Sequence, residues 1–210
     1  MGIERKLKMI SFLDGEVNAI RDKYGNKPAG RVIDLGGGQE PFMAASVIVD
    51  FLRQKVTNAR FIQSDLCDPK TYDQFSDQEF DWVWCNHTLE DLYNPFIVLE
   101  SCKRISKQGI FGMPHWTREI TIQSVRPDWE NICGWPHHFW LIGINRQTSA
   151  LEFFPKLCWL VAGERPYTTA NINFEWNGEE LPYANIHHEY NGASRRNDLI
   201  AWLERRWLTE

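Results

Sequence analysis

Histidines beside predicted strand ends are the residues of this sequence best suited to acid–base chemistry. His87 lies in "CNHTLED", His115 in "MPHW", and His137 and His138 in "GWPHHFW". A neutral imidazole can accept the proton of a hydroxyl group, which is a poor nucleophile until that proton leaves. We therefore expect a general base among them, with His115 first, then His87, then the pair His137 and His138. For each, the alternative is a hydrogen-bonded structural imidazole.

Carboxylates follow two of these histidines. Glu90 and Asp91 come just after His87, where capping or orienting the following helix is the expected role. Glu119 lies one helical turn beyond His115 and could orient its ring, or it could face solvent.

Three consecutive glycines, Gly36–Gly38, follow the apolar stretch "RVIDL". Glycine allows positive φ and a close approach of backbone to ligand, and ligands of open parallel sheets bind beyond the carboxyl ends of strands. A dinucleotide fingerprint needs a third glycine where this chain has Gln39, Glu40 and Pro41. The missing glycine and the charge of Glu40 disfavour NAD or FAD, so a nicotinamide oxidoreductase is the minor alternative.

Short apolar stretches bounded by polar, Gly or Pro residues must position these groups. They are "RVIDL", "SVIVDF", "ARFIQSD", "FDWVWCN" and "GIFGMP". Continuous apolarity predicts strands covered on both faces. A helix is expected from Pro95 to a stop at Gly109, and one of at most two turns within Gln39 to Ala45. This alternation predicts an α/β fold, a Rossmann-like doubly wound and mostly parallel sheet.

The remaining segments complete one predicted domain over 1–210. Its parts are an N-terminal helix over 1–28, a core sheet over 30–155, and a C-terminal extension or lid and helix over 156–210. Within these, the stretch "HHFWLIGINRQTSALEFFP", residues 137–155, predicts an antiparallel hairpin at the C-terminal edge of the sheet. An Asn-Gly pair in "INFEWNGEELPY" predicts a second hairpin, and "SRRNDLIAWLERRWL" predicts a helix.

"VIDLGGG", with its acidic residue two positions before the first glycine, resembles motif I of class I S-adenosylmethionine-dependent methyltransferases. The order of the later segments, through "RISKQG" into the last core strand, is also similar to that family over roughly residues 30–115. The short glycine turn ending in proline resembles a type-11-like, glycan-associated subgroup. S-adenosyl-L-methionine carries no phosphate, so acidic loops are compatible with it.

This resemblance implies residue roles. Asp50 would accept hydrogen bonds from both ribose hydroxyls, Asp65 with neighbouring Leu66 would recognise the adenine, and Asn86 would contact the cofactor. The implied cofactor-binding set is Asp34, Gly36, Gly37, Gly38, Asp50, Asp65, Leu66 and Asn86.

The implied function is O-methylation, with a sugar hydroxyl of a surface glycan or glycoconjugate as acceptor. Two alternatives stay open: methylation of a small aromatic metabolite, and a non-catalytic module that binds the cofactor for a partner enzyme. Ten tryptophans, most of them in the second half, are expected to fill the core singly but could line a ligand cleft as a group.

The composition of the chain limits the classes of binding partner and the cellular compartment that we expect. A net charge of −5 argues against nucleic acid, and no run approaches the roughly 20 apolar residues of a membrane span. The start lacks a secretory signal and the five cysteines form no C-x-x-C pair, so a cytoplasmic chain with reduced thiols is expected. Cys133 with His137 or His138 offers too few ligands, so no metal is predicted. The acceptor is a small molecule or glycan, and oligomeric state is left open.

Overall fold

The computed structural model describes residues 30–39, 41–53, 58–120, 134–156, 171–176, 181–186 and 196–207. The predicted N-terminal helix over 1–28 lies outside these residues.

A six-stranded sheet forms the centre of the molecule, in the order β3-β2-β1-β4-β5-β8. Its strands are β1 (Val32–Leu35), β2 (Val47–Asp50), β3 (Arg60–Gln63), β4 (Trp82–Asn86), β5 (Gly109–Pro114) and β8 (Asn171–Trp176). The first five pair in parallel, and β8 runs antiparallel to β5. Strands β1, β2 and β5 are buried along their whole length, as their continuous apolar sequences predict.

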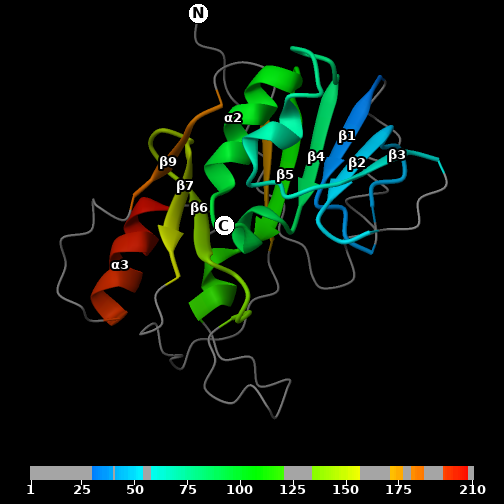
Figure 1. Ribbon diagram of the computed structural model, residues 1–210. Helices are drawn as coiled ribbons and strands as arrows, with labels where there is room; N and C mark the ends of the chain where they lie inside the picture. Colours follow the sequence, from blue (N-terminus) through cyan, green and yellow to red (C-terminus); the bar gives the residue numbers. More distant parts are fainter. Residues whose placement is uncertain are drawn as a thin grey trace, which may run out of the picture.

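Helix α2 (Pro95–Ile105) covers one face of this sheet (Figure 1). It begins with Pro95 in its first turn, where the missing N–H is not needed. Its buried stripe packs into the largest core cluster, together with residues of β1, β2, β4 and β5; the stripe is Val98, Leu99, Cys102 and Ile105. The predicted helix is therefore confirmed, although it ends four residues before Gly109. Short 3-10 turns η1 (Pro69–Tyr72), η2 (Leu89–Asp91) and η3 (Trp116–Ile120) complete the connections.

The opposite face is covered differently. The described part of the connection between β1 and β2 contains turns rather than the short helix expected within Gln39 to Ala45. Phe42 from this connection stacks on Trp84 of β4, with ring centroids 4.6 Å apart. Phe42 is 2% exposed, so one aromatic ring covers the apolar surface for which a helix was predicted.

A second, three-stranded sheet contains β6 (Trp140–Ile144), β7 (Leu151–Pro155) and β9 (Tyr183–Asn185). It lies beside α2, with helix α3 (Arg196–Arg206) on its outer side (Figure 1). The predicted hairpin over 137–155 forms as β6 and β7, but in this small sheet, because β8 takes the antiparallel edge beside β5. The hairpin predicted in "INFEWNGEELPY" is wrong, since β8 pairs with β5 and β9 pairs in parallel with β7.

Candidate functional site

A cavity of about 460 Å³ opens at the carboxyl ends of β1 to β4. Four consecutive strand–loop junctions line it: Gly36 and Gly38; Asp50, Phe51 and Leu52; Asp65, Leu66 and Cys67; His87, Thr88, Asp91, Leu92 and Tyr93. The strand order reverses between β1 and β4, and open α/β sheets bind ligands at this switch point. We call this pocket the main cavity.

The glycine turn takes the backbone shape that its sequence predicts. Gly36 and Gly38 have φ of +77° and +55°, which favour glycine. A Cβ on Gly36 would lie 2.3 Å from the Thr88 hydroxyl, whereas one on Gly38 would meet nothing within 4 Å. The Thr88 hydroxyl donates toward the Gly36 carbonyl at 3.2 Å, which fastens the turn to the end of β4. Gly36 is thus fixed by packing, and Gly38 borders open space.

Two aspartates hold this turn in different ways. Asp50 accepts hydrogen bonds from the N–H groups of Gly38 (2.8 Å) and Leu52 (2.7 Å), and it also lines the main cavity. A carboxylate has about four lone-pair sites, so Asp50 can accept further bonds. Asp34 is 1% exposed and accepts from the Phe42 N–H at 2.7 Å. It supports the turn from within the core and is not among the lining residues.

The other predicted cofactor residues also divide into those that line the main cavity and those that do not. Asp65 accepts the Cys67 N–H at 2.7 Å, and Asp65 and Leu66 both line the main cavity. Gly37 and Asn86 are not among the lining residues. Asn86 ends β4, and its carbonyl accepts the Thr88 hydroxyl at 3.1 Å.

Of the four candidate bases, His87 is the one that lines the main cavity. Its Nδ1 lies 3.2 Å from Oε1 of Glu90, whose side chain is 1% exposed. Its φ is +50°, which is uncommon for a residue with a side chain and is found at functional sites. A buried carboxylate thus orients a half-exposed imidazole at the pocket wall.

His115 is placed elsewhere. It is 6% exposed, its Nδ1 lies 2.6 Å from the Thr117 hydroxyl, and it is not among the residues lining the main cavity. The prediction that Glu119 orients His115 is wrong, because the Glu119 carboxylate is bonded to His138 instead.

His138 belongs to a group of charged side chains beside the main cavity. Its Nδ1 lies 2.9 Å from Oε1 of Glu119, and Lys156 donates to the other Glu119 oxygen at 2.7 Å. On the opposite side, Nε2 of His138 lies 3.5 Å from Oδ1 of Asp91, and Nε2 of His137 lies 3.7 Å from the same oxygen. We call these five residues the histidine–carboxylate cluster.

The cluster shifts the proton affinities of its members. Burial, and then the nearby Glu90 carboxylate, raise the pKa of Asp91 to about 7. Burial alone would lower the pKa of His138, but the Glu119 carboxylate raises it on balance. Burial likewise opposes ionisation of Glu119, yet its bonds to His138 and Lys156 lower its pKa. Glu119 is therefore the carboxylate held ionised, while Asp91 is poorly compensated.

The small sheet is docked against the loop that carries His87 and Asp91. The Phe139 N–H donates to the Glu90 carbonyl at 2.7 Å, and the Trp140 indole donates to the Leu92 carbonyl at 2.7 Å. The Trp140 ring also packs edge-on against Phe96 of α2, with centroids 5.6 Å apart. These contacts bring the segment containing His137 and His138 to the main cavity.

Residues 43–111 match a family model described as a methyltransferase domain. This stretch is therefore similar to a methyltransferase domain, as the resemblance of the glycine turn to class I S-adenosylmethionine-dependent methyltransferases implies. The match runs from β2 into β5, and the glycine turn precedes it by four residues. No curated protein matches the chain.

Solved structures similar to this chain cover different shares of it. A methyltransferase from Archaeoglobus fulgidus, dependent on the same donor, is 20% identical over 49% of this chain and 53% of its own, with a TM-score of 0.39. One from Mesorhizobium loti is 16% identical over 51% and 57%, with a TM-score of 0.41. The PH0226 protein from Pyrococcus horikoshii OT3 is 17% identical over 78% and 88%, with a TM-score of 0.45. The chain thus spans about half the length of the first of these relatives.

Large apolar side chains are exposed around the main cavity. Phe51, Leu52 and Tyr93 are 68%, 65% and 64% exposed, and all three line it. Exposed apolar groups beside a polar pocket are typical of ligand sites. No tryptophan is among the described residues that line this cavity, and Trp116 is fully buried in a separate core cluster. Trp129 and Trp159 lie outside the described residues.

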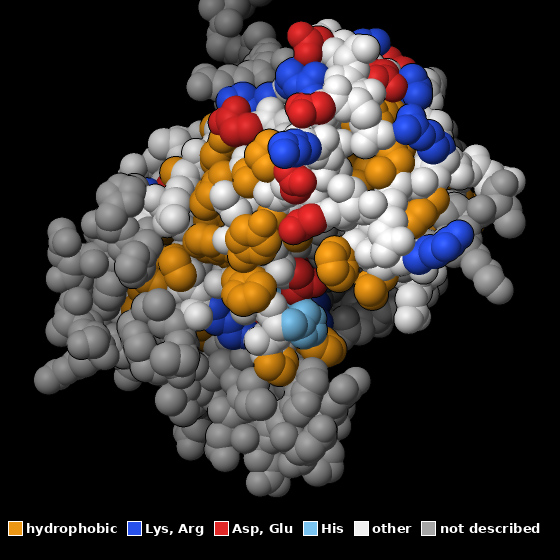
Figure 2. All heavy atoms as spheres, in the orientation of Figure 1, with side chains coloured by type: hydrophobic (Ala, Val, Ile, Leu, Met, Phe, Trp, Pro, Cys, Tyr) orange, Lys and Arg blue, Asp and Glu red, His pale blue; other side chains and the backbone are white. Residues whose placement is uncertain are grey.

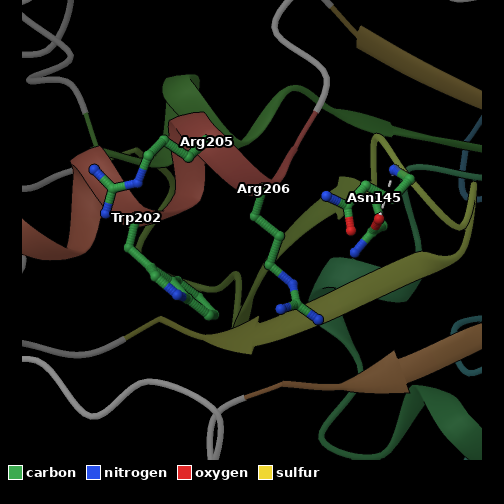
Figure 3. Close-up of a pocket in the computed structure, with 5 residues that line it drawn as sticks. Asn145, Trp202, Arg205 and Arg206 are labelled. Carbon is green, nitrogen blue, oxygen red and sulfur yellow. Dashed lines mark hydrogen bonds between the residues drawn. The ribbon is translucent and has the colours of Figure 1, made fainter.

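A second hollow of about 230 Å³ lies between α3 and the end of β6. Asn145, Gln147, Trp202, Arg205 and Arg206 line it. Arg205 and Arg206 leave α3 in different directions (Figure 3), and Arg206 donates to the Glu152 carboxylate at 2.5 and 2.7 Å. The charge of Arg206 is thus neutralised within the fold, and the hollow shares no lining residue with the main cavity.

The sequence indicated some site residues and missed others. Thr88, Tyr93, Phe51 and Leu52 were not predicted, although each directly follows or lies near a predicted strand end. Cys67, Cys85 and Cys102 are free and buried, as expected of reduced thiols, while Cys133 and Cys158 lie outside the described residues. In the part of the chain that the structure describes, no helix is both long and apolar enough to cross a bilayer.

Proposed function

We propose that this chain is an S-adenosylmethionine-dependent O-methyltransferase that acts on a sugar hydroxyl. The observation that carries the proposal is the convergence on one cavity of Gly38, Asp50 and the carboxylate-oriented His87. The proposal treats 1–210 as one methyltransferase domain in which the C-terminal part flanks the acceptor side.

The lining residues suit a nucleoside without phosphate. Asp50 offers acceptor capacity for vicinal ribose hydroxyls, and Gly38 has no neighbour within 4 Å of a built Cβ, so backbone there can approach a ligand. Phe51 and Leu52 provide exposed apolar surface for the faces of a base. A volume of about 460 Å³ is in the range of small-molecule sites. These features fit S-adenosylmethionine, with Asp65 and Leu66 on its adenine side and Asp34, Gly37 and Asn86 supporting the loops that hold it.

His87 is the general base of this proposal. When bound, S-adenosylmethionine supplies a methyl carbon made electrophilic by the adjacent sulfonium. The Glu90 carboxylate occupies Nδ1 of His87, which fixes the ring proton on that nitrogen and leaves the lone pair on Nε2. That lone pair accepts the proton of the acceptor hydroxyl as its oxygen attacks. His115 and His138 are then structural or positioning residues.

The acceptor assignment rests on the cavity wall and on resemblance to the glycan-associated subgroup. Tyr93 presents an exposed aromatic face, and Asp91 lines the same wall. An aromatic face beside a carboxylate suits a sugar ring, which combines aliphatic faces with hydroxyl edges. We therefore favour a sugar hydroxyl of a glycan or glycoconjugate over a small aromatic metabolite.

Ligand protection and turnover test the proposal in sequence. S-adenosylhomocysteine should raise the thermal unfolding midpoint of the purified chain and NAD should not, because specific ligands stabilise the folded state. Labelled S-adenosylmethionine should then transfer its methyl group to members of a panel of activated sugars. Binding without transfer to sugars or phenols would support the non-catalytic module, and transfer to phenols alone would move the acceptor to an aromatic metabolite.

A further inference from the structure

Asp91, His137 and His138 bring three potential metal ligands together at the edge of the main cavity. Their ligand atoms all lie within 4.8 Å of one another. The two histidine rings are nearly perpendicular, with centroids 4.6 Å apart, and each presents Nε2 toward the same Asp91 oxygen. Figure 2 shows histidine atoms at the surface of the face in view, next to acidic and hydrophobic side chains, without distinguishing which histidine they belong to.

The separations suit an ion better than direct hydrogen bonds. Oδ1 of Asp91 lies 3.5 and 3.7 Å from the two imidazole nitrogens, is inaccessible to solvent and makes no hydrogen bond within the described residues. Bonds of about 2.0–2.2 Å in a tetrahedral site place neighbouring ligand atoms about 3.3–3.6 Å apart. The oxygen–nitrogen distances of 3.5 and 3.7 Å are therefore at or just above this range, so a small closure would place all three atoms around a shared cation.

The hydrogen bonds around His138 also favour metal coordination by its Nε2. Its other nitrogen, Nδ1, bonds Glu119 at 2.9 Å, and Glu119 is itself fixed by Lys156 and the Trp135 N–H. Metal-bound histidines characteristically bond a carboxylate through their second nitrogen, which orients the ring. The Glu119 contact thus leaves Nε2 as the nitrogen that can coordinate.

The local charge also favours a cation. Glu90, Asp91 and Glu119 lie around the two histidines, and Glu119 is the member neutralised by Lys156. Glu90 and Asp91 each have a buried carboxylate oxygen that makes no hydrogen bond within the described residues. A bound divalent ion would offset this excess of negative charge.

We propose that Asp91, His137 and His138 form a site for a divalent transition-metal ion of the Zn²⁺ class. Two imidazoles and one carboxylate are a ligand set that such ions accept, with the remaining position open to water or a ligand oxygen. The site is a property of these side chains and does not depend on the proposed function. If that function is also correct, an acceptor hydroxyl in the main cavity would reach the open position.

Zinc binding to the full chain tests the proposal without methyl donor or acceptor. Chain stripped with a chelator should bind one equivalent of Zn²⁺ in calorimetry, and Co²⁺ should give the d–d absorption of a four- or five-coordinate ion. His137→Ala and Asp91→Asn should each weaken Zn²⁺ affinity at least about tenfold. Asp77→Asn, at a side chain 79% exposed and paired with Arg104, is the matched carboxylate control and should not change affinity.

His137→Ala keeps the test decisive if Asp91→Asn fails to fold, because the His137 side chain is 57% exposed and its loss leaves the core intact. Circular dichroism of each variant verifies the fold. The proposal is overturned if wild-type chain binds no stoichiometric Zn²⁺, or if the folded variants bind it as tightly as wild type. In the second case the ion sits on other histidines or cysteines.

Discussion

The main cavity and the histidine–carboxylate cluster adjoin each other but are assembled by different means. The residues of the main cavity end strands β1 to β4 or lie in the loops that follow them, and parallel pairing brings those strand ends to one edge. The cluster instead joins η2, η3 and the two ends of the β6–β7 hairpin, which meet through tertiary docking. Substitutions in the main cavity should therefore change ligand affinity or turnover, and substitutions of the buried residues of the cluster should change the free energy of unfolding.

Replacing the base should give the largest effect on the cavity side of this comparison. His87→Asn keeps a residue that tolerates the φ of +50° and removes the imidazole. Turnover should fall by about 10²- to 10⁴-fold, the contribution of general acid–base catalysis. The affinity for S-adenosylhomocysteine, measured by calorimetry, should stay close to that of wild type.

His115→Asn is the matched control for this experiment, since His115 is a histidine outside the main cavity. Glu90→Gln should give an intermediate loss of kcat with little change in KM, because it removes the negative charge that orients His87. If His115→Asn abolishes turnover while His87→Asn retains it, the base assignment passes to His115.

Removing the central carboxylate of the cluster should give the largest loss of stability. In Glu119→Ala, the Lys156 ammonium, whose side chain is 11% exposed, and the buried His138 lose their shared partner. Breaking a buried pair in this way costs about 3–5 kcal/mol, which urea unfolding would measure. At the exposed Asp77–Arg104 pair, Asp77→Ala should cost less than about 1 kcal/mol. Equal losses in the two variants would mean that the cluster is no better buried than a surface pair.

The same contrast explains what the sequence could predict. Apolar runs followed by Gly36, Asp50 and Asp65 specify both the strands and the edge at which their ends meet, so the fold and much of the cavity follow from local pattern. The partner of Glu119 does not follow, because His138 lies 19 residues away across a hairpin whose docking depends on tertiary contacts. Likewise β8 displaces the predicted edge hairpin, and no local feature near Phe174 specifies that it packs on Phe111.

Substitutions of Asp50 test whether the main cavity binds a ribose, and so whether changes there alter ligand binding rather than stability. Asp50→Ala removes a carboxylate that can accept hydroxyl donors, and hydrogen bonds to a charged group contribute about 1.5–3 kcal/mol. Affinity for S-adenosylhomocysteine should therefore fall by about tenfold to a hundredfold. Asp50→Asn, which keeps acceptor capacity on one oxygen, should lose less. Unchanged calorimetric affinity in Asp50→Ala would remove the ribose role from this residue.

Replacing Tyr93 should give the smallest effect of these substitutions. It tests whether the main cavity has separate sides for the methyl donor and the acceptor. Its ring is 64% exposed and lines the cavity beside Asp91 and Leu92, so its loss disturbs no core packing. A single aromatic contact contributes about 0.5–1.5 kcal/mol, which corresponds to a rise in acceptor KM of up to about tenfold. Tyr93→Ala should therefore raise the KM for a sugar acceptor, with cofactor affinity and unfolding free energy nearly unchanged.

Tyr93→Phe should restore the wild-type KM if the aromatic face is what the acceptor contacts. A loss confined to cofactor affinity would instead assign Tyr93 to the donor side, since the cavity residues that follow β3 lie within reach of the same ring.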